Sequence, residues 1–534
     1  MPNVESGFTP EEEHVQTECG LVAIYSVLLD TQAMVGLGLL AANGVQHRGQ
    51  QGGGISYPTR EGQRLLTGNG LLPDVFTSNV ISTFNEENPG NWLQIHTRYG
   101  SDPEAAYSIN NLQPLIAYSP EGSPVSVIHN GQFVAKDEIR KQVYELTGRE
   151  YPDDVSDSFL AAQLIANAPG ESWDGRVIEG INRLKGAFSL VVGVEDRLYL
   201  ARDEQGLQPL VVGKLQDGWL ATSETHALKK AGVKPDRSIL RGEIARIDQR
   251  GLLTIQEGQT GQGNFCDFEW AYFGRPESRT PNFNSPDDAM HPERWLSHHA
   301  ARRETGIIFV EELSRTAEGR ELLTKIQMVT GAPDSGVSFG TGVAIGAKLP
   351  YESVIIRDHH DQNGKLRLFQ EADIQKIQAH VAGKLSFVPG SIEGKIVAIS
   401  DDSKVRSNVS KSLTEQAWAE GAAEVHWFLG YPPVISPCHL GKNMRTQEEL
   451  IAWRHKGDLK KIAEEVTATS VNYISWRGSI EGWKQGGEII TPEDEREIFL
   501  ANGGCGGCLT GLHPIAKDGT VYKLGAIKTT EASV

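Results

Sequence analysis

The chain has 534 residues, a formal net charge of −18, 39% hydrophobic residues and 22% charged residues. One hydrophobic core rarely serves so long a chain, so two or more domains are expected. The acidic balance argues against a nucleic-acid or anionic-membrane partner, and no apolar run approaches the ~20 residues of a membrane span.

The first half of the chain predicts strands interrupted by helices. Residues 1–18 are acidic and lack the apolar stretch of a secretory signal. From Cys19 to about Ile255, seven short apolar runs read as strands: CGLVAIYSVLL, GGGISY, NWLQIHT, SVIHNG, AFSLVVGV, RLYLARD and GWLATS. DSFLAAQLIANA has the 3–4 spacing of a helix, with Asp157 and Ser158 as capping residues. This pattern predicts an α/β layered domain with mostly antiparallel strands.

The pattern changes after a polar, glycine-rich segment, residues 256–264, which is a candidate linker. Three buried-type strands follow, IQMVTGAPDSG, ESVIIRD and GKIVAISDDS, and then a helix, VSKSLTEQAWAEGA, and a further strand, AEVHWFLG. This repetition predicts a parallel sheet with ligands at the carboxyl ends of its strands. The tail beyond Arg445 is predicted to be mostly helical, with loops through Gly503–Gly507.

Cys19 stands alone, since the other four cysteines lie at or beyond residue 266. On position alone, a buried small apolar residue in a strand is the commonest fate of a free cysteine. The alternative is an N-terminal nucleophile exposed by cleavage after Glu18. A free α-amine, with a pKa near ~8, can take the thiol proton without a histidine base.

Four residues downstream favour the nucleophile. Arg98 can pair with a carboxylate through two hydrogen bonds. Asn130 and the backbone N–H of Gly131 can form an oxyanion hole over a thioester intermediate. Asp157 can hold an ammonium group. Each signal is weak by itself, but together with a thiol they suit free glutamine as the substrate.

The motifs occur in the order of a known family. They are CG at residue 19, QHRGQ at 46, RY at 98, HNG at 129 and DS at 157, followed by LKGAFSLVV, ARDEQGLQPLVVGK, SETHAL and RGEIARID. In this order the chain resembles the glutamine phosphoribosylpyrophosphate amidotransferase (amidophosphoribosyltransferase) family over nearly its whole length. The resemblance implies a propeptide (1–18), an N-terminal-nucleophile (αββα) glutamine amidotransferase domain (19–260) and a type I phosphoribosyltransferase-like domain with a helical tail (261–534). It also favours Cys19 as the nucleophile.

The second half extends the resemblance. VTGAPDSGVSFGTG resembles the pyrophosphate loop of the family, and IVAISDDSKVRSNVS resembles its phosphoribosylpyrophosphate motif. Two carboxylates after an apolar strand suit ribose hydroxyls and a hydrated Mg²⁺, and the helix start that follows suits a 5′-phosphate; for the acidic pair alone, a turn is the alternative. The resemblance implies Mg²⁺ ligation by Ser335, Asp401 and Asp402. The implied phosphoribosylpyrophosphate-binding residues are Asp334, Ser335, Gly336, Arg367, Lys384, Asp401, Asp402, Ser403, Val405, Arg406, Ser407, Asn408 and Ser410.

The chain departs from the family pattern at several positions. Ser407 stands where the family usually has Gly, and Val409 where it usually has Thr. In RDHHDQNGKLRLFQ, only Arg367 and Phe369 align well with the family's flexible catalytic loop. The remaining departures are Phe159 for Glu, Gln132 for Asn and Pro389 for a basic residue. These departures leave two alternatives open, a paralogue that aminates another phosphorylated or nucleotide-like acceptor and a non-catalytic regulatory relative.

The remaining cysteines match the ligand positions of an iron–sulfur cluster in the resembled family. They lie in NFCDFEWAYFGRP, SPCHLG and GGCGGCLTG, and the implied [4Fe–4S] ligands are Cys266, Cys438, Cys505 and Cys508. Four thiolates can equally bind Zn²⁺, and buried unligated thiols are a third reading. Two histidine pairs are interpreted as unrelated to metal. His359-His360-Asp361 falls in an expected mobile loop, and His298-His299 is expected on a solvated helix face.

The resemblance implies a glutamine-dependent glycosyltransferase of purine biosynthesis. Glutamine would be hydrolysed at Cys19, and ammonia would travel inside the protein to C1 of phosphoribosylpyrophosphate, giving 5-phosphoribosylamine. The expected cofactors are Mg²⁺ and the cluster, and the expected substrates are glutamine and phosphoribosylpyrophosphate. We expect a cytoplasmic homo-oligomer, a dimer or tetramer, with no nucleic-acid or membrane partner.

Overall fold

The computed structural model describes residues 19–84, 90–99, 111–260, 263–281, 285, 287–357, 385–442, 444, 446–485 and 504–521.

The first half contains two antiparallel sheets. The seven-stranded sheet has the order β11-β9-β10-β1-β4-β2-β3, and its strands are β1 (Gly20–Ser26), β2 (Gly52–Thr59), β3 (Gly62–Asn69), β4 (Trp92–Arg98), β9 (Val211–Lys214), β10 (Gly218–Thr222) and β11 (Pro235–Ser238). The six-stranded sheet has the order β13-β12-β8-β7-β6-β5, and its strands are β5 (Leu115–Tyr118), β6 (Pro124–Phe133), β7 (Gly186–Val194), β8 (Arg197–Arg202), β12 (Ile244–Asp248) and β13 (Gly251–Gln256).

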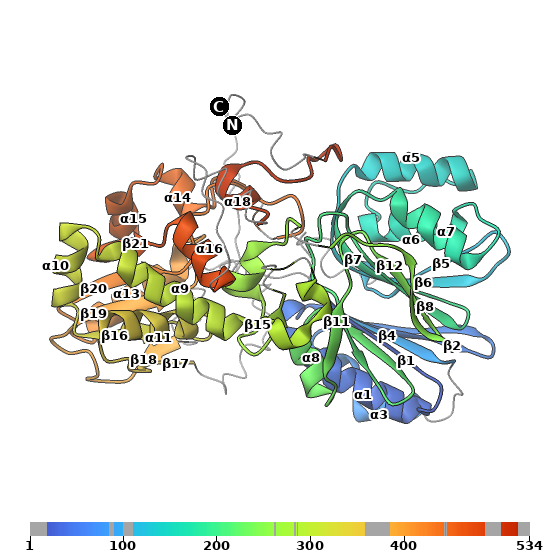
Figure 1. Ribbon diagram of the computed structural model, residues 1–534, viewed down its shortest axis with the longest axis horizontal. Coiled ribbons are helices and arrows are strands. Elements are labelled where there is room, and N and C mark those ends of the chain that lie inside the picture. Colours follow the sequence, from blue (N-terminus) through green and yellow to red (C-terminus); the bar gives the residue numbers. More distant parts are fainter. Residues whose placement is uncertain are drawn as a thin grey trace, which may run out of the picture.

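These two sheets lie face to face between layers of helices (Figure 1). The space between them is filled by apolar side chains such as Leu21 and Ala23 of β1, Ile128 of β6 and Val191 of β7. Helix α1 (Thr31–Asn43) covers the seven-stranded sheet with α8 (Thr225–Lys230), and α2 (Leu72–Val75) and α3 (Ser78–Thr83) lie beside it. The six-stranded sheet is covered by α5 (Lys136–Thr147), α6 (Asp157–Asn167) and α7 (Trp173–Asn182). The predicted layered α/β domain is therefore confirmed as an αββα sandwich.

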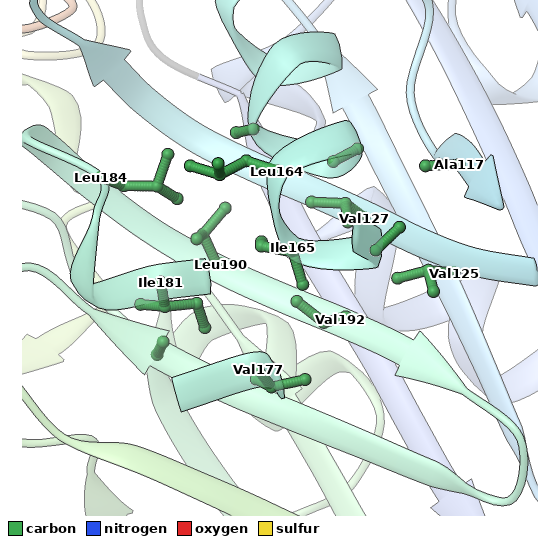
Figure 2. Close-up of a cluster of buried hydrophobic side chains, with 14 of the residues drawn as sticks. Ala117, Val125, Val127, Leu164, Ile165, Val177, Ile181, Leu184, Leu190 and Val192 are labelled. Atoms are coloured by element: carbon green, nitrogen blue, oxygen red, sulfur yellow. The ribbon is translucent and has the colours of Figure 1, made fainter. Parts of the chain in front are cut away.

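The outer layer over the six-stranded sheet depends on helix α6. Figure 2 shows Leu164 and Ile165 of this helix against Leu190 and Val192 of β7. The helix begins at Asp157 as predicted, but its cap is Ser156, one residue earlier. Ser156 has extended φ and ψ of −68° and 153°, and its Oγ accepts a hydrogen bond from the backbone N–H of Phe159 at 3.1 Å. An N-cap residue stands just outside the helical dihedrals, which explains the shift.

The second half contains a parallel sheet covered on both faces. Its strands are β16 (Met328–Gly331), β19 (Ile396–Asp401), β20 (Glu424–Leu429) and β21 (Ser470–Tyr473), in that order. Phe309 of α9 (His298–Leu313) and Phe339 of α11 (Gly336–Ala347) pack on one face, and α13 (Asn408–Ala419) and α15 (Leu459–Glu465) pack on the other. Three shorter helices are α10 (Ala317–Lys325), α14 (Ile451–Arg454) and α16 (Trp476–Lys484). The predicted parallel sheet is confirmed.

Three expectations for this half were wrong. ESVIIRD does not join the parallel sheet, because β17 (Ile355–Arg357) pairs antiparallel with β18 (Leu385–Phe387). Its Ile356 is 47% exposed, whereas strands of a parallel sheet are buried on both faces. Within the described part of the tail, the helices α14 and α15 are short, and β21 adds an edge strand that the sequence pattern did not predict.

The third expectation concerned the histidines that open α9. His298 is 2% exposed, its Nε2 lies 2.8 Å from Thr280 Oγ1, and its ring packs on Trp270. Burial lowers the pKa of His298 to about 4, so the ring is neutral near pH 7. This end of α9 is therefore interior rather than solvated. In the part of the chain that the structure describes, no helix is both long and apolar enough to cross a membrane.

Candidate active site

Cys19 lies at the start of β1, where that strand meets the end of β4. Gly20 pairs with Thr97 in register, and the Gly20 N–H donates to Thr97 Oγ1 at 3.1 Å. The Cys19 Sγ lies 3.6 Å from the carbonyl oxygen of Tyr99. Antiparallel pairing therefore places the thiol beside the last residues of β4, 80 positions away in sequence.

Arg98 closes β4 next to this thiol and is 9% exposed. Its guanidinium donates to the carbonyl oxygen of Asn111. Burial lowers the pKa of Arg98, while the charges of Cys19 and Asp157 act in the opposite direction, so all three groups lie within electrostatic reach. The structure thus places Arg98, the predicted carboxylate clamp, within electrostatic reach of both Asp157, the predicted ammonium acceptor, and Cys19, the predicted nucleophile.

Asp157 opens α6 and is held by donors from the end of β6 and from its own helix. Its Oδ2 accepts hydrogen bonds from Gln132 Nε2 at 2.8 Å and from the Phe133 N–H at 2.9 Å, and its Oδ1 accepts from the Ser158 N–H. Gln132, one of the departures from the family pattern, is therefore an anchor of the site carboxylate. The neighbouring His129 contacts Ser158 Oγ through Nδ1 at 2.8 Å, and burial lowers its pKa to about 4.

Asn130 and Gly131 lie near the end of β6. Asn130 is fully buried, and neither polar atom of its side chain has a hydrogen-bond partner among the described residues. Alternation along β6 puts Asn130 on the same face as Ile128, which is the face that meets β1 between the sheets. Gly131 has a φ of +132°, and a Cβ there would lie 1.9 Å from the Ala187 carbonyl oxygen, so only glycine fits.

An unpaired amide in an interior costs free energy unless a ligand completes it. We expect Asn130→Ala to lower kcat for glutamine hydrolysis by about 10²- to 10³-fold, because one donor to the developing oxyanion is lost. Steady-state glutaminase assays measure the change. Asn167→Ala is a matched control, since Asn167 hydrogen-bonds Gln163 within α6. Equal kcat in wild type and Asn130→Ala would remove Asn130 from the oxyanion hole.

The second set of predicted residues lies at the carboxyl end of β19. Ser335 Oγ donates to Asp401 Oδ1 at 3.4 Å, and Ser403 Oγ donates to Asp402 Oδ1 at 2.9 Å. Burial and the charge of Asp402 raise the pKa of Asp401 well above its ordinary value, and burial raises that of Asp402 to about 6. Asp402 Oδ2 has no hydrogen-bond partner among the described residues. Two adjacent carboxylates, the buried Asp402 and the half-buried Asp401, fit a divalent cation such as Mg²⁺.

The predicted pyrophosphate loop faces this acidic pair. Gly336 opens α11, and a Cβ on it would lie 2.2 Å from the Ser400 carbonyl oxygen, so glycine permits the close approach. Asp334 is 74% exposed and forms an ion pair with Arg357 at 3.1 Å. Arg357 also donates to the Pro333 carbonyl oxygen at 2.9 Å. Sequence reasoning missed this arginine, although it is the first residue of the segment RDHHDQNGKLRLFQ that is compared with the catalytic loop.

The predicted phosphate-binding residues from Ser403 to Ser410 span the loop after β19 and the first turn of α13, so the predicted loop of residues 405–410 ends inside the helix. Ser410 Oγ donates to the Ser407 carbonyl oxygen, Asn408 is the first helical residue, and Val405 is buried. The Arg406 guanidinium binds Glu449, with Nε 2.9 Å from Oε2. Two predicted binding residues, Arg367 and Lys384, lie outside the described residues, as do His359, His360 and Asp361.

Lys404 is the residue of this loop that the sequence reasoning passed over. It is 3% exposed, and its Nζ lies 4.0 Å from the centre of the Trp427 ring. Burial lowers the pKa of Lys404 to about 7, while the charges of Asp401 and Glu465 act in the opposite direction. Its place in a polar loop gave no sequence signal of this burial.

The four cysteines of the second half converge on one interior region. Cys266, Cys505 and Cys508 are buried and Cys438 is half-buried, and none forms a disulfide. The backbone N–H of Cys505 donates to the Phe265 carbonyl oxygen, and Cys508 packs with Cys266 in one apolar cluster. Burial raises the pKa values of Cys505 and Cys508 well above the ordinary thiol value, so thiolates there need a cation.

The donor geometry bears on which metal fits. The described residues contain no group of three or more His, Cys, Asp or Glu side chains that could hold a metal ion. Zinc needs its ligands around one point, whereas a [4Fe–4S] cluster spreads its cysteine ligands over a larger body. Both readings would use the same four thiols, Cys266, Cys438, Cys505 and Cys508.

The two halves are joined by a buried charged network that sequence reasoning missed. Arg48, fully buried, donates to Glu224 at 2.6 Å and to Glu269 at 2.7 Å, and Lys442 donates to Glu269 at 2.8 Å. His47 lies 2.8 Å from Glu224. The charges of Arg48 and Lys442 outweigh burial and lower the pKa of Glu269 to about 2. The sequence signal that could have indicated this network is Arg48, the arginine inside the motif QHRGQ.

Known proteins resemble this chain over most of its length. A family model described as a glutamine amidotransferase domain matches residues 104–230. The amidophosphoribosyltransferase of Synechococcus elongatus is 30% identical over 510 residues, covering 93% of this chain and 91% of that protein. The human amidophosphoribosyltransferase is 28% identical over 552 residues, covering 95% and 99%.

A solved structure agrees with these relatives. It is the glutamine phosphoribosylpyrophosphate amidotransferase of Bacillus subtilis complexed with ADP and GMP, which matches with a TM-score of 0.75 at 28% identity and covers 93% of this chain and 97% of that one. The match confirms the predicted fold, an N-terminal-nucleophile glutaminase joined to a phosphoribosyltransferase-like unit. The chain belongs to the amidophosphoribosyltransferase family.

Proposed function

We propose that the chain uses glutamine to aminate phosphoribosylpyrophosphate, giving 5-phosphoribosylamine for purine biosynthesis. The observation that carries the proposal is that one layer of the fold contains both a thiol and a buried amide side chain that has no hydrogen-bond partner among the described residues. Cys19 precedes β1 beside Arg98, and the buried Asn130 side chain faces the same layer between the sheets. Family membership supports the overall reaction, and the site residues provide the steps.

The glutamine half-reaction begins with Cys19 freed by cleavage after Glu18; residues 1–18 lie outside the described residues. The thiol proton passes to the α-amine of Cys19 as the sulfur attacks the amide carbon, forming a C–S bond. Asn130 Nδ2 and the Gly131 N–H donate to the oxyanion. The protonated α-amine returns the proton to the leaving nitrogen, ammonia departs, and water hydrolyses the thioester to glutamate.

Arg98 and Asp157 would hold the two ends of the amino acid. Arg98 suits the α-carboxylate, because guanidinium and carboxylate pair through two hydrogen bonds. Asp157 suits the α-ammonium, and its existing bonds to Gln132 and Phe133 fix its orientation. This clamp sets the amide carbon against Cys19 and excludes substrates that lack either charge.

A small pocket lies where the two halves meet. Its volume is about 10 Å³, about the space of one water molecule, and its lining includes Ser223 and Glu224 from the first half and Glu269 and His298 from the second. Ser223 Oγ accepts a hydrogen bond from the Leu21 N–H at 3.0 Å, so one wall touches the strand that begins next to Cys19. We propose that ammonia passes between the halves at this junction.

The acceptor site would bind phosphoribosylpyrophosphate across the end of the parallel sheet. Asp401, Asp402 and Ser335 would hold Mg²⁺, which supplies charge stabilisation for the departing pyrophosphate. Residues 334–336 would receive the pyrophosphate, and the start of α13 with residues 403–410 would receive the 5′-phosphate. Ammonia then attacks C1, a C–N bond forms, and the C1–O bond to pyrophosphate breaks.

Glutaminase activity measured with and without phosphoribosylpyrophosphate tests the proposal. Turnover that rises when phosphoribosylpyrophosphate and Mg²⁺ are added, together with 5-phosphoribosylamine formation, is the expected result. Unstimulated hydrolysis would point to another acceptor. A protein without hydrolysis after confirmed removal of residues 1–18 would be a non-catalytic relative.

We further propose that Cys266, Cys438, Cys505 and Cys508 hold a [4Fe–4S] cluster with a structural role. Bonds from these thiolates would tie the start of the second half, the loop after β20 and the tail together. The gathering of these cysteines in neighbouring buried clusters supports a shared metal group.

Metal analysis of purified protein should give about four irons and acid-labile sulfide per chain. Cys508→Ser is expected to lose iron and to lower the urea midpoint, because a buried ligand is removed. Cys19→Ala removes a thiol that lies outside this region, so this variant should keep its full iron content. About one zinc per chain would support the zinc reading instead, and neither metal would leave unligated thiols.

The location of the protein and its oligomeric state complete the proposal. None of the five cysteines, all within the described residues, forms a disulfide, which suits a reducing compartment and supports the cytoplasm as the location. The homo-oligomeric state, a dimer or tetramer, rests on family membership alone.

A further inference from the structure

A tyrosine hydroxyl, a carboxylate and a cysteine sulfur meet in the apolar cluster around the cysteines of the second half. Tyr431 Oη donates a hydrogen bond to Asp267 Oδ2 at 2.8 Å and lies 3.4 Å from Cys508 Sγ. Tyr431 is fully buried, Asp267 is 2% exposed and Cys508 is 8% exposed. These residues come from the start of the second half, the loop after β20 and the tail, which are the same three segments that carry the four cysteines.

The Tyr431 ring and the carboxylate beside it are both held in place. Phe268 meets the ring edge-on, with the ring centres 4.8 Å apart and the planes at 73°, and the Trp483 ring stacks on it with the centres 6.3 Å apart. Asp267 Oδ1 accepts a hydrogen bond from the Phe268 N–H at 3.1 Å. Packing and a hydrogen bond together therefore fix the hydroxyl next to the sulfur.

This polar pair is costly if it serves only to fill space. Burying a carboxylate and a hydroxyl costs free energy that two apolar side chains of similar volume would not. Neither Asp267 nor Tyr431 belongs to the residues proposed to bind glutamine, Mg²⁺ or phosphoribosylpyrophosphate. A polar pair at this depth beside Cys508 indicates that the sulfur needs a hydrogen-bond donor.

A thiol that binds a metal loses its proton, so its sulfur can only accept hydrogen bonds. Cys438 has such a donor in the backbone, because its Sγ accepts the Leu440 N–H at 3.4 Å. At Cys508 the donor at the same distance is a side chain, the hydroxyl of Tyr431. The single hydroxyl proton would be shared between Asp267 Oδ2 and the sulfur in a three-centre bond.

We propose that the Tyr431 hydroxyl, positioned by Asp267, donates a hydrogen bond to the Cys508 thiolate and stabilises the metal group held by the four cysteines. Outer hydrogen bonds of this kind orient a ligand, and their loss typically costs about 10- to 100-fold in metal affinity. Tyr431 is a positioning residue, because the sulfur rather than the hydroxyl would bind the metal. The inference rests on the proposed [4Fe–4S] cluster in that Cys508 is one of its ligands.

Iron release from the purified, full-length holoprotein tests this role. Wild type, Tyr431→Phe and Tyr199→Phe are mixed with an iron chelator, and the loss of the cluster is followed by its visible absorbance. Phe keeps the aromatic ring and removes the hydroxyl. Tyr199→Phe is the matched control, because Tyr199 is also fully buried and its hydroxyl donates to a carboxylate, Asp174 Oδ1, at 2.9 Å, but it lies on β8 in the first half.

Tyr431→Phe is expected to release iron at least about tenfold faster than wild type. Tyr199→Phe should release it at the wild-type rate, because its hydrogen bond is remote from the cysteines. The thiolate-to-iron absorption band of Tyr431→Phe should also move to longer wavelength, since loss of a hydrogen bond raises the energy of the sulfur lone pair. A purely structural role of Tyr431 would not move this band.

An unchanged release rate in Tyr431→Phe would overturn the role of Tyr431. Faster release without movement of the absorption band would also overturn it, since loosened packing would then explain the loss of iron. Wild-type protein purified without iron would instead contradict the proposed cluster itself. Failure of the inference is therefore distinguishable from failure of the proposal on which it rests.

Discussion

Cys19→Ala is expected to abolish glutamine-dependent amination, with a loss of at least about 10⁴-fold in kcat, because no other group can form the thioester. Cys19 stands 3.6 Å from the Tyr99 carbonyl oxygen at the junction of β1 and β4, and its neighbours Arg98 and Asp157 are already in place. The measurement is product formation from glutamine and phosphoribosylpyrophosphate under saturating conditions.

Ammonia supplied directly is the control for this variant. Cys19→Ala should form product from ammonium salt at the wild-type rate, because the acceptor site lies in the other half of the chain. Cys266→Ala is not a suitable comparison, since its thiol belongs to the proposed cluster. Persistence of glutamine-dependent product in Cys19→Ala would show that Cys19 is not the nucleophile.

Mass spectrometry of the same preparations addresses the leader. The nucleophile needs a free α-amine, so active wild type should begin at Cys19. Protein with residues 1–18 attached should be inactive with glutamine and active with ammonia. Full glutaminase activity in protein whose Glu18–Cys19 bond is intact would exclude the α-amine as the base.

Much of this arrangement was predictable from sequence because strand pairing follows local pattern. The alternating runs that precede Arg98 and contain Asn130 each formed the strand that was expected, and the helix after Ser156 began where its spacing placed it. An apolar strand followed by two aspartates correctly indicated the edge of a parallel sheet at Asp401. The local strand and helix patterns therefore predicted which site residues could lie close together.

The interactions that sequence did not reveal are those made across the chain. His298 looked solvated because its neighbours in sequence are charged, yet Thr280 and Trp270 bury it. Lys404 lies in a polar loop but reaches a ring on β20. The short strand β21 has only four residues, and its pairing with β20 is decided by the sheet rather than by its own composition.

The charged network between the halves is the clearest such case, and it predicts the second large effect. Arg48→Met should lower the free energy of unfolding by about 3–5 kcal/mol, because Glu224 and Glu269 would keep their buried charges after losing their shared cation. Both glutamates are at most 4% exposed, so water cannot replace the guanidinium. Urea denaturation followed by tryptophan fluorescence measures the change.

Two further variants decide whether the effect comes from the buried charges. Arg140→Met breaks an ion pair with Asp137, whose side chain is 97% exposed, and should cost less than about 1 kcal/mol. Glu224→Gln combined with Arg48→Met should recover part of the stability, because Glu269 keeps Lys442 as its partner while Glu224 is the carboxylate that loses its buried cation. Equal urea midpoints for Arg48→Met and Arg140→Met would contradict this account.

The network joins QHRGQ, next to the glutamine site, to the segment that opens the second half. Loss of Arg48 should therefore also lower the amount of 5-phosphoribosylamine formed per glutamine hydrolysed, as ammonia escapes at the loosened junction.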